Sequence, residues 1–162
     1  MDEYSERNAQ VATIDQMIRH ITWQSHKEML HSLSRPEVDL TMPQTVTLFA
    51  IRGMQTCRMS ELAEVTHQSA GTLTGIVDRL IEENLVGRVR DVEDRRVVQV
   101  TLTAEGENRL TLVEHLLQEE MGQRLRAFNT EQLQHFSSLL GLLMQSFHEQ
   151  GHELANLNAA VI

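Results

Sequence analysis

Hydrophobic and polar positions follow a helical repeat from the start of the chain. Apolar residues recur every three or four positions at Val11, Ile14, Ile18 and Ile21. This spacing places them on one face, so we expect one long amphipathic helix over residues 6–33. Pro36 and Pro43 interrupt the repeat, and a proline at position 43 suits the first turn of the next helix.

Three short helices are predicted next. The first contains Val46, Leu48, Phe49 and Ile51 and ends near residue 53. Ser60 is the expected N-cap of the second, which has the sequence ELAEV. Ser69 is the expected N-cap of the third, which runs to Glu83 and carries one apolar stripe formed by Leu73, Ile76, Val77 and Leu80.

The period changes to two after the third short helix. Val98, Val100 and Leu102 alternate with polar residues, and Leu85, Val86 and Val89 precede them. These two runs predict a β-hairpin whose tip is the charged segment RDVEDRR, residues 90–96. Two short helices joined by a tight turn and followed by a hairpin describe a helix-turn-helix with a wing.

Two longer helices are predicted after the hairpin. Thr103 is the expected N-cap of the first, and Thr130 opens the second. Together the terminal helices carry more apolar surface than one small domain covers. We therefore expect a homodimer that buries four leucines against the second subunit, namely Leu112, Leu116, Leu139 and Leu143.

The expected fold is mainly α-helical with a small β-hairpin wing. We expect dimerisation helices over residues 1–35 and 104–150, and a winged helix-turn-helix lobe over residues 36–103. Residues 151–162 form a tail that the pattern does not place.

Composition narrows the class of protein. The 162 residues are 41% hydrophobic and 23% charged, as in an ordinary globular protein. With a single cysteine, no apolar run long enough to span a bilayer and no signal-like N-terminus, we expect a cytoplasmic protein that does not bind membranes. Motifs for metal hydrolysis, phosphate loops and nucleophile elbows do not occur, so we expect neither an enzyme nor a cofactor.

Taken over the whole chain, the net charge of −9 argues against nucleic-acid binding. Residues 41–103, however, hold 7 arginines and 8 acidic residues, so the middle of the chain is nearly neutral between acidic flanks. Phosphate binding needs a locally basic face and not a basic whole protein. The charge therefore leaves DNA binding open.

Two stretches of the chain point to a known family, and they are LTMPQTVTLFAI, residues 40–51, and MSELAEVTHQSAGTLTGIVDRLIEENLVGRVRDVEDRRVVQVTLTAEG, residues 59–106. They resemble the multiple-antibiotic-resistance regulator (MarR) family of bacterial repressors. The most specific part is DVEDRRVVQVTLTAEG, which is similar to the family pattern D-x-x-D-R-R…L-T-x-x-G. The resemblance implies a homodimeric winged-helix repressor that binds a pseudo-palindromic operator in double-stranded DNA and is released by a small ligand or by oxidation.

The resemblance also implies which residues contact DNA. In the family, a wing-tip arginine enters the minor groove and the aspartate before it holds that arginine in position. The matching arginines here are Arg95 and Arg96, of which Arg96 is preferred, and the matching aspartate is Asp94. The third short helix reads the major groove. Its expected contacts with DNA are Ser69, Gly71, Thr72, Thr74 and Gly75. Arg79 is either a phosphate contact or, together with Asp78, part of an ion-pair network near the wing. Gly75 departs from the family, which often has a long polar residue there, and this shifts weight onto the two threonines and the wing.

An effector pocket is expected where the dimerisation helices meet the DNA-binding lobe. Its candidate residues are Trp23, His26, Phe49, Arg52 and His115. Trp23 could stack on an aromatic or phenolic acid and Arg52 could hold its carboxylate. The alternative is ordinary packing or solvation of each residue.

Three further alternatives remain at this point. Cys57 is either a buried, inert thiol or a redox sensor whose pKa is lowered by Arg52 and Arg58. His148 and His152 are four residues apart but lack a third nearby ligand, so we expect no metal site. A winged-helix protein-interaction module without DNA binding is the rival to a DNA-binding regulator.

Overall fold

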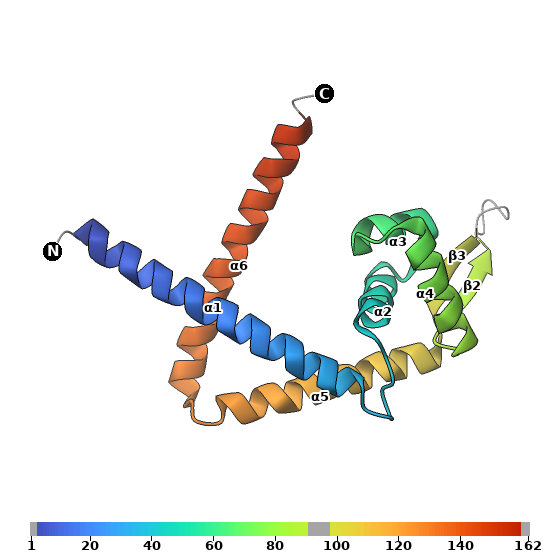
Figure 1. Cartoon of the computed structure of the whole chain (residues 1–162), viewed down its shortest axis with the longest axis horizontal. Helices are drawn as coiled ribbons and strands as arrows, with labels where there is room; N and C mark the ends of the chain where they lie inside the picture. The colour runs from blue at the N-terminus through green and yellow to red at the C-terminus, as the bar shows by residue number, and fades with distance from the viewer. Residues whose placement is uncertain (1–2, 91–97, 160–162) are drawn as a thin grey trace. The chain divides into compact units, whose positions relative to one another are not determined.

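The computed structural model describes residues 3–90 and 98–159, and the side chains of residues 4–90 and 98–146. It is mainly helical with one small antiparallel sheet, as the sequence predicted (Figure 1). The chain divides into two compact units, Met1–Gln118 and Glu119–Ile162, which we describe separately. No helix in the described part of the chain is long and apolar enough to cross a membrane.

The first unit begins with the long helix α1, Glu3–Leu33, followed by α2, Met42–Met54. Thr41 caps α2, because the Gln44 backbone N–H donates to Thr41 Oγ1 at 3.4 Å and the Thr41 N–H donates to Gln44 Oε1 at 2.8 Å. Pro43 lies in the first turn of α2, as predicted. Both boundaries therefore follow from local sequence signals.

Helices α3, Met59–Thr66, and α4, Ala70–Glu82, form the helix-turn-helix. The prediction that Ser60 caps α3 is wrong, because Arg58 occupies the N-cap position and its backbone N–H donates to Glu61 Oε2 at 2.8 Å. A strand runs directly into this helix, so no separate capping serine is needed. The prediction for α4 is confirmed, since the Thr72 N–H donates to Ser69 Oγ at 3.2 Å.

The sheet contains one strand more than the predicted hairpin. Strands β2, Val86–Arg90, and β3, Val98–Leu102, pair as expected, and β1, Thr56–Arg58, adds to the other edge of β3 in the order β1-β3-β2. Strand β1 has three residues, of which Cys57 alone is buried. Such a short run shows no alternation, which is why the sequence did not reveal it.

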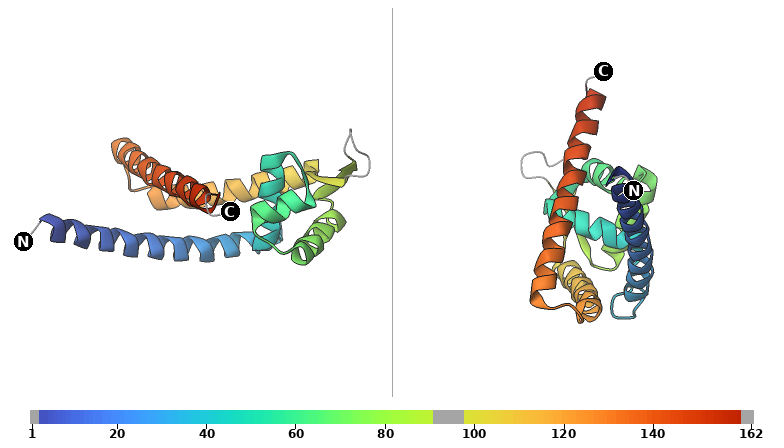
Figure 2. Two further views of the ribbon diagram at one scale, coloured as in Figure 1. Left: turned by 90° about the horizontal axis from the view of Figure 1, so that it is seen from above. Right: turned by 90° about the vertical axis from the view of Figure 1, so that its left-hand side faces the viewer.

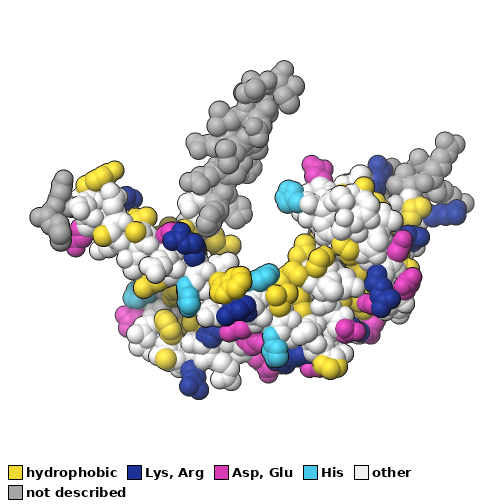
Figure 3. All heavy atoms as spheres, viewed as in Figure 1, with side chains coloured by type: hydrophobic (Ala, Val, Ile, Leu, Met, Phe, Trp, Pro, Cys, Tyr) yellow, Lys and Arg dark blue, Asp and Glu magenta, His cyan; other side chains and the backbone are white. Residues whose placement is uncertain are grey.

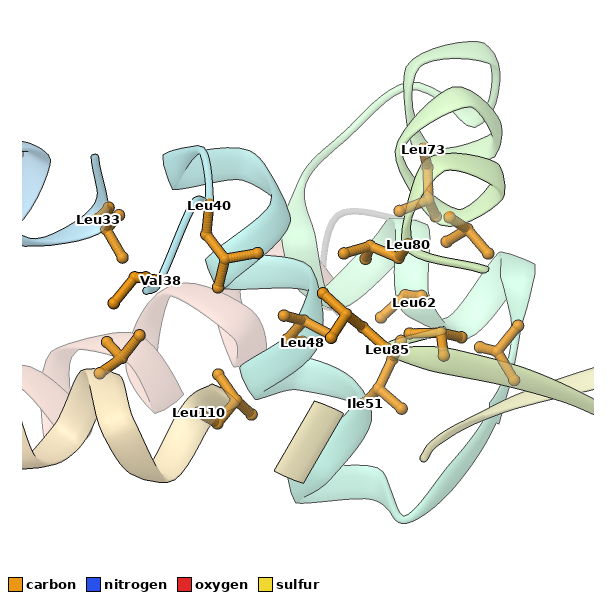
Figure 4. Packing of buried hydrophobic residues seen from close by; sticks show 14 of the residues in the cluster. Leu33, Val38, Leu40, Leu48, Ile51, Leu62, Leu73, Leu80, Leu85 and Leu110 are labelled. Carbon is orange, nitrogen blue, oxygen red and sulfur yellow. The ribbon is translucent and has the colours of Figure 1, made fainter. Parts of the chain in front are cut away.

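The core lies between α2, α3, α4, the sheet and the first part of α5, Ala104–Leu125 (Figure 4). The three short helices α2, α3 and α4 pack together, and the left-hand view of Figure 2 shows the hairpin beside them. Thr103 caps α5 as predicted, with the Gly106 N–H donating to Thr103 Oγ1 at 3.0 Å. Leu116 is only 8% exposed within this core and Leu112 is partly buried against it, so the expectation that these two leucines bury only against a second subunit is wrong.

The second unit contains the end of α5 and the helix α6, Thr130–Ala159. Helix α6 begins at Thr130 as predicted, and its cap is Asn129, whose Oδ1 accepts from the Gln132 N–H at 2.9 Å. The rings of Phe128 and Phe136 lie 6.1 Å apart and fasten the turn to the helix. The backbone of residues 151–159, which the sequence pattern did not place, continues this helix.

Candidate DNA-binding interface

Helix α4 presents one buried side and a broad exposed surface. Leu73, Val77 and Leu80 are fully buried. The residues expected to contact DNA are all exposed on the remaining surface, and they are Ser69, Gly71, Thr72, Thr74, Gly75 and Arg79. The helical period therefore separates the packing residues of α4 from its candidate contact residues.

The hydroxyl groups at the start of α4 already make short-range hydrogen bonds. Ser69 Oγ and Thr72 Oγ1 lie 2.9 Å apart, and Thr74 Oγ1 donates to the Ala70 carbonyl at 2.8 Å. The Thr74 hydroxyl proton is thus engaged, while its oxygen retains acceptor capacity toward solvent. This arrangement suits contacts with amino groups of bases, and the N-terminus of the helix suits a phosphate.

Gly71 and Gly75 contribute no side chain to the outward surface of α4. A Cβ atom added at either position would meet no heavy atom within 4 Å. Packing therefore does not require glycine at these positions. Their effect is to let another molecule approach the helix backbone closely.

A hollow of about 650 Å³ lies on the side of α4 that faces the start of α2. Thr72, Gly75 and Arg79 line it from α4, opposite Asp39 and Thr41. The predicted effector residues do not line this hollow. It belongs to the same exposed surface as the candidate DNA contacts.

The opposite side of α4 is tied to the wing. Arg88 Nη2 on β2 donates to Asp78 Oδ1 at 2.6 Å. Arg79 points elsewhere, with its Nε 2.7 Å from Glu83 Oε1 and its Nη1 3.5 Å from Glu82 Oε2. These contacts favour the ion-pair interpretation of Asp78 and Arg79 that the sequence left open.

The wing-tip residues Asp94, Arg95 and Arg96 lie outside the described residues. Strand β2, which precedes them, carries two arginines that the sequence pattern did not single out, Arg88 and Arg90. Val86, Arg88 and Arg90 alternate along β2 and share one face of the sheet. That alternation is visible in the sequence and could have identified them.

The expected effector residues are not gathered around a described cavity. Arg52 donates from Nη1 to Glu114 Oε2 at 3.0 Å, also binds Glu114 Oε1 through Nη2, and stacks 5.0 Å from the Phe49 ring. Trp23 is 61% exposed, with the Lys27 ammonium 6.0 Å from its ring. His26 and His115 are exposed. Glu114 of the same chain therefore supplies the carboxylate that a ligand was expected to bring to Arg52.

Cys57 is completely buried on β1. Burial raises the pKa of the Cys57 thiol, and the nearby Glu61 carboxylate raises it further. This direction is opposite to that required by the redox alternative, in which Arg52 and Arg58 lower the pKa of the thiol. A protonated, buried thiol supports the inert interpretation.

No group of three or more potential metal ligands occurs within residues 4–90 and 98–146. The histidine pair His148 and His152 falls outside the side chains that the structure describes.

A helix-turn-helix with an exposed second helix, flanked by a three-stranded sheet, defines a winged helix-turn-helix protein. The sequence model of the MarR family matches residues 40–98. The chain is 31% identical over 133 residues to the uncharacterized HTH-type transcriptional regulator YsmB of Bacillus subtilis, covering 80% of this chain and 88% of YsmB. The chain therefore belongs to the MarR family, whose members are transcriptional regulators and not enzymes.

Two further similarities agree with this assignment. The HTH-type transcriptional repressor MdtR of Bacillus subtilis is 34% identical over 80 residues, which cover 49% of this chain and 50% of MdtR. The structure of a MarR family protein from Bacillus stearothermophilus superimposes with a TM-score of 0.77 and 27% identity, covering 91% of this chain and 99% of that one. The predicted family and fold are both confirmed.

Proposed function

We propose that the protein represses transcription as a homodimer bound to a pseudo-palindromic operator in double-stranded DNA. The observation that carries this proposal is the exposed, polar and glycine-containing surface of α4 beside the base of the wing. A helix of this kind fits the major groove while the wing follows the neighbouring backbone or minor groove. Figure 3 shows Lys and Arg side chains near the wing, where phosphates would lie.

Exposed apolar residues on the terminal helices support the dimer. On α1, one stripe remains in solvent in the single chain and consists of Val11, Ile14, Ile18 and Ile21. On α6, the expected dimer residues Leu139 and Leu143 are also exposed. Burying a large aliphatic side chain contributes roughly 1.5–3 kcal/mol, so a few such pairs outweigh repulsion between acidic subunits.

The wing is proposed to supply the minor-groove contact. Arg96 is the preferred reader, with Asp94 as its brace and Arg95 beside it, on the basis of the family pattern DVEDRR. The described α4 surface carries one arginine, Arg79, and that side chain is engaged by two glutamates. The wing is therefore proposed to contribute most of the positive charge.

Repression and release by an effector are proposed from the relatives. MdtR, half of whose length is matched by this chain, is named a repressor. An aromatic carboxylate remains the proposed effector, bound near Trp23 and Arg52. Such a ligand has to displace Glu114 from Arg52, and this exchange would change the contact between α2 and α5.

DNA selection from a random pool, followed by binding to the region upstream of the protein's own gene, tests this function. We expect a partly palindromic site bound by two subunits. Failure to shift any DNA at low salt would favour the rival interaction module. A folded monomer at micromolar concentration in a sedimentation experiment would refute the dimer. The proposed effector pocket would be refuted if aromatic carboxylates change the DNA affinity of neither the wild-type protein nor Trp23→Ala.

A further inference from the structure

Strand β2 runs back along α4. Helix α4 ends at Glu82, β2 begins at Val86, and the Leu85 N–H donates to the Leu80 carbonyl at 2.8 Å, so the chain reverses tightly between them. The Asp78–Arg88 ion pair joins the two elements across this reversal. Figure 1 shows the β2 arrow beside α4.

This geometry determines which residue of α4 lies beside Arg90. Arg90 lies two residues beyond Arg88 on the same face of β2, about 6.6 Å further at a strand rise of about 3.3 Å per residue. That distance equals roughly four residues of helix at about 1.5 Å each. Counted back from Asp78, it places Arg90 level with Thr74, beside the exposed surface of α4.

The two arginines of β2 differ in their partners. Arg88 is paired with Asp78, so its charge is locally cancelled. Arg90 is exposed, and no hydrogen bond or ion pair joins its side chain to another residue in the described part of the chain. Its cross-strand neighbour, Val98, is also exposed and is apolar.

We infer that Arg90 is a DNA-phosphate contact in the angle between α4 and the wing, and that the Asp78–Arg88 ion pair is the brace that positions it. Arginine carries a permanent charge and a fork of donors that matches phosphate oxygens. Of the two β2 arginines, only Arg90 has a side chain without an acidic partner among the described residues, and it lies beside the reading surface. This inference rests on the proposed DNA-binding function.

The salt dependence of binding tests Arg90. Each lost phosphate contact makes the slope of log K against log salt shallower by about 0.9, so Arg90→Gln should change the slope of a dimer by about 1.8. The advantage of wild type over Arg90→Gln should then shrink about twelvefold between about 50 and 200 mM salt. Matched and scrambled sites should be affected equally, because phosphates carry no sequence information.

Arg126→Gln is the matched control, because it removes the same charge from an exposed position outside the first unit. Its slope should equal that of wild type. Equal thermal midpoints for wild type and Arg90→Gln would show that folding is unchanged. If Arg90→Gln leaves the slope unchanged while wild type binds its operator, the assignment of Arg90 is overturned and the proposed function stands; if wild type binds no DNA, both fail.

The positioning role of the Asp78–Arg88 ion pair is tested separately, by the operator affinity of Asp78 variants. Asp78→Asn removes a negative charge near DNA, and charge counting alone predicts tighter binding. If Asp78 positions β2 through Arg88, the variant should instead bind its operator several-fold more weakly, and Asp78→Glu should restore part of the affinity. Tighter binding by Asp78→Asn would overturn the brace.

Discussion

Arg52 on α2 and Glu114 on α5 form a two-point ion pair, with Arg52 Nη1 3.0 Å from Glu114 Oε2 and a second contact between Nη2 and Oε1. Glu107 adds a weaker contact at 3.6 Å. The hydrogen bond to Glu114 raises the pKa of Arg52 and lowers that of Glu114. The pair therefore joins α2 to α5.

Glu114→Gln should lower the free energy of unfolding at neutral pH by less than about 1 kcal/mol, since both partners are partly exposed and screened by solvent. The Glu114 pKa is depressed in the folded state, so its contribution is present above the unfolded-state pKa and disappears as pH falls through the folded-state pKa. Urea unfolding at neutral and acidic pH measures this. The prediction would be contradicted if wild type and Glu114→Gln differed in unfolding free energy as much at acidic pH as at neutral pH. Glu64→Gln, which changes an exposed glutamate, is the control.

Gly106→Ala should destabilise the protein by about 1–3 kcal/mol through overpacking. A Cβ at this position would lie 2.1 Å from the Leu85 carbonyl oxygen, which is backbone and cannot rotate away. Gly122→Ala, in the same helix, meets no atom within 4 Å and should be neutral or stabilising by up to about 1 kcal/mol. Thermal unfolding of both variants checks the contrast, and equal midpoints would refute the close approach of α5 to Leu85.

Cys57 should react slowly with iodoacetamide in the folded protein near neutral pH, because the thiol is buried and its pKa is raised. Unfolding in urea should release full reactivity. DNA binding should also survive mild peroxide treatment. Rapid alkylation of the native protein, or peroxide-induced release that a thiol reductant reverses, would instead establish the redox alternative.

Arg96→Ala should weaken operator binding by about 1–3 kcal/mol and reduce the preference for A·T pairs in the flanks, if Arg96 enters the minor groove. Asp94→Ala should act in the same direction, because it releases the arginine that it braces. Affinities of both variants on A·T-rich and G·C-rich flanks distinguish this role from a plain phosphate contact. Tighter binding by Asp94→Ala would exclude the brace at the wing tip.

Local features of the fold were predictable from sequence, and contacts between distant residues were not. The stripe of α4 and its Ser69 cap depend on neighbours within a few positions, so period and capping rules found them. Strand β1 depends on pairing Cys57 with Val100, which no local pattern reports. The same limit explains Arg52, which was expected to hold a ligand but binds Glu114, 62 positions away in the chain.

The candidate interface was predicted in the same uneven way. The exposed positions of α4 followed from its helical period, whereas the availability of each arginine depended on its partner. Arg79 and Arg88 are both paired with acidic residues, and neither partner could be assigned by composition. Arg90 became a candidate only once the position of β2 along α4 was known.

Operator spacing tests the central proposal of a dimer that reads two half-sites. Half-sites for such a dimer lie about one helical turn apart, so inserting about 5 bp between them rotates one half-site to the opposite side of the DNA. Fluorescence anisotropy of wild-type protein on the selected operator and on the lengthened operator measures the effect. We predict that affinity falls at least about a hundredfold, toward the non-specific level. Equal affinity for the two operators, or a stoichiometry of one subunit per operator, would contradict the proposal.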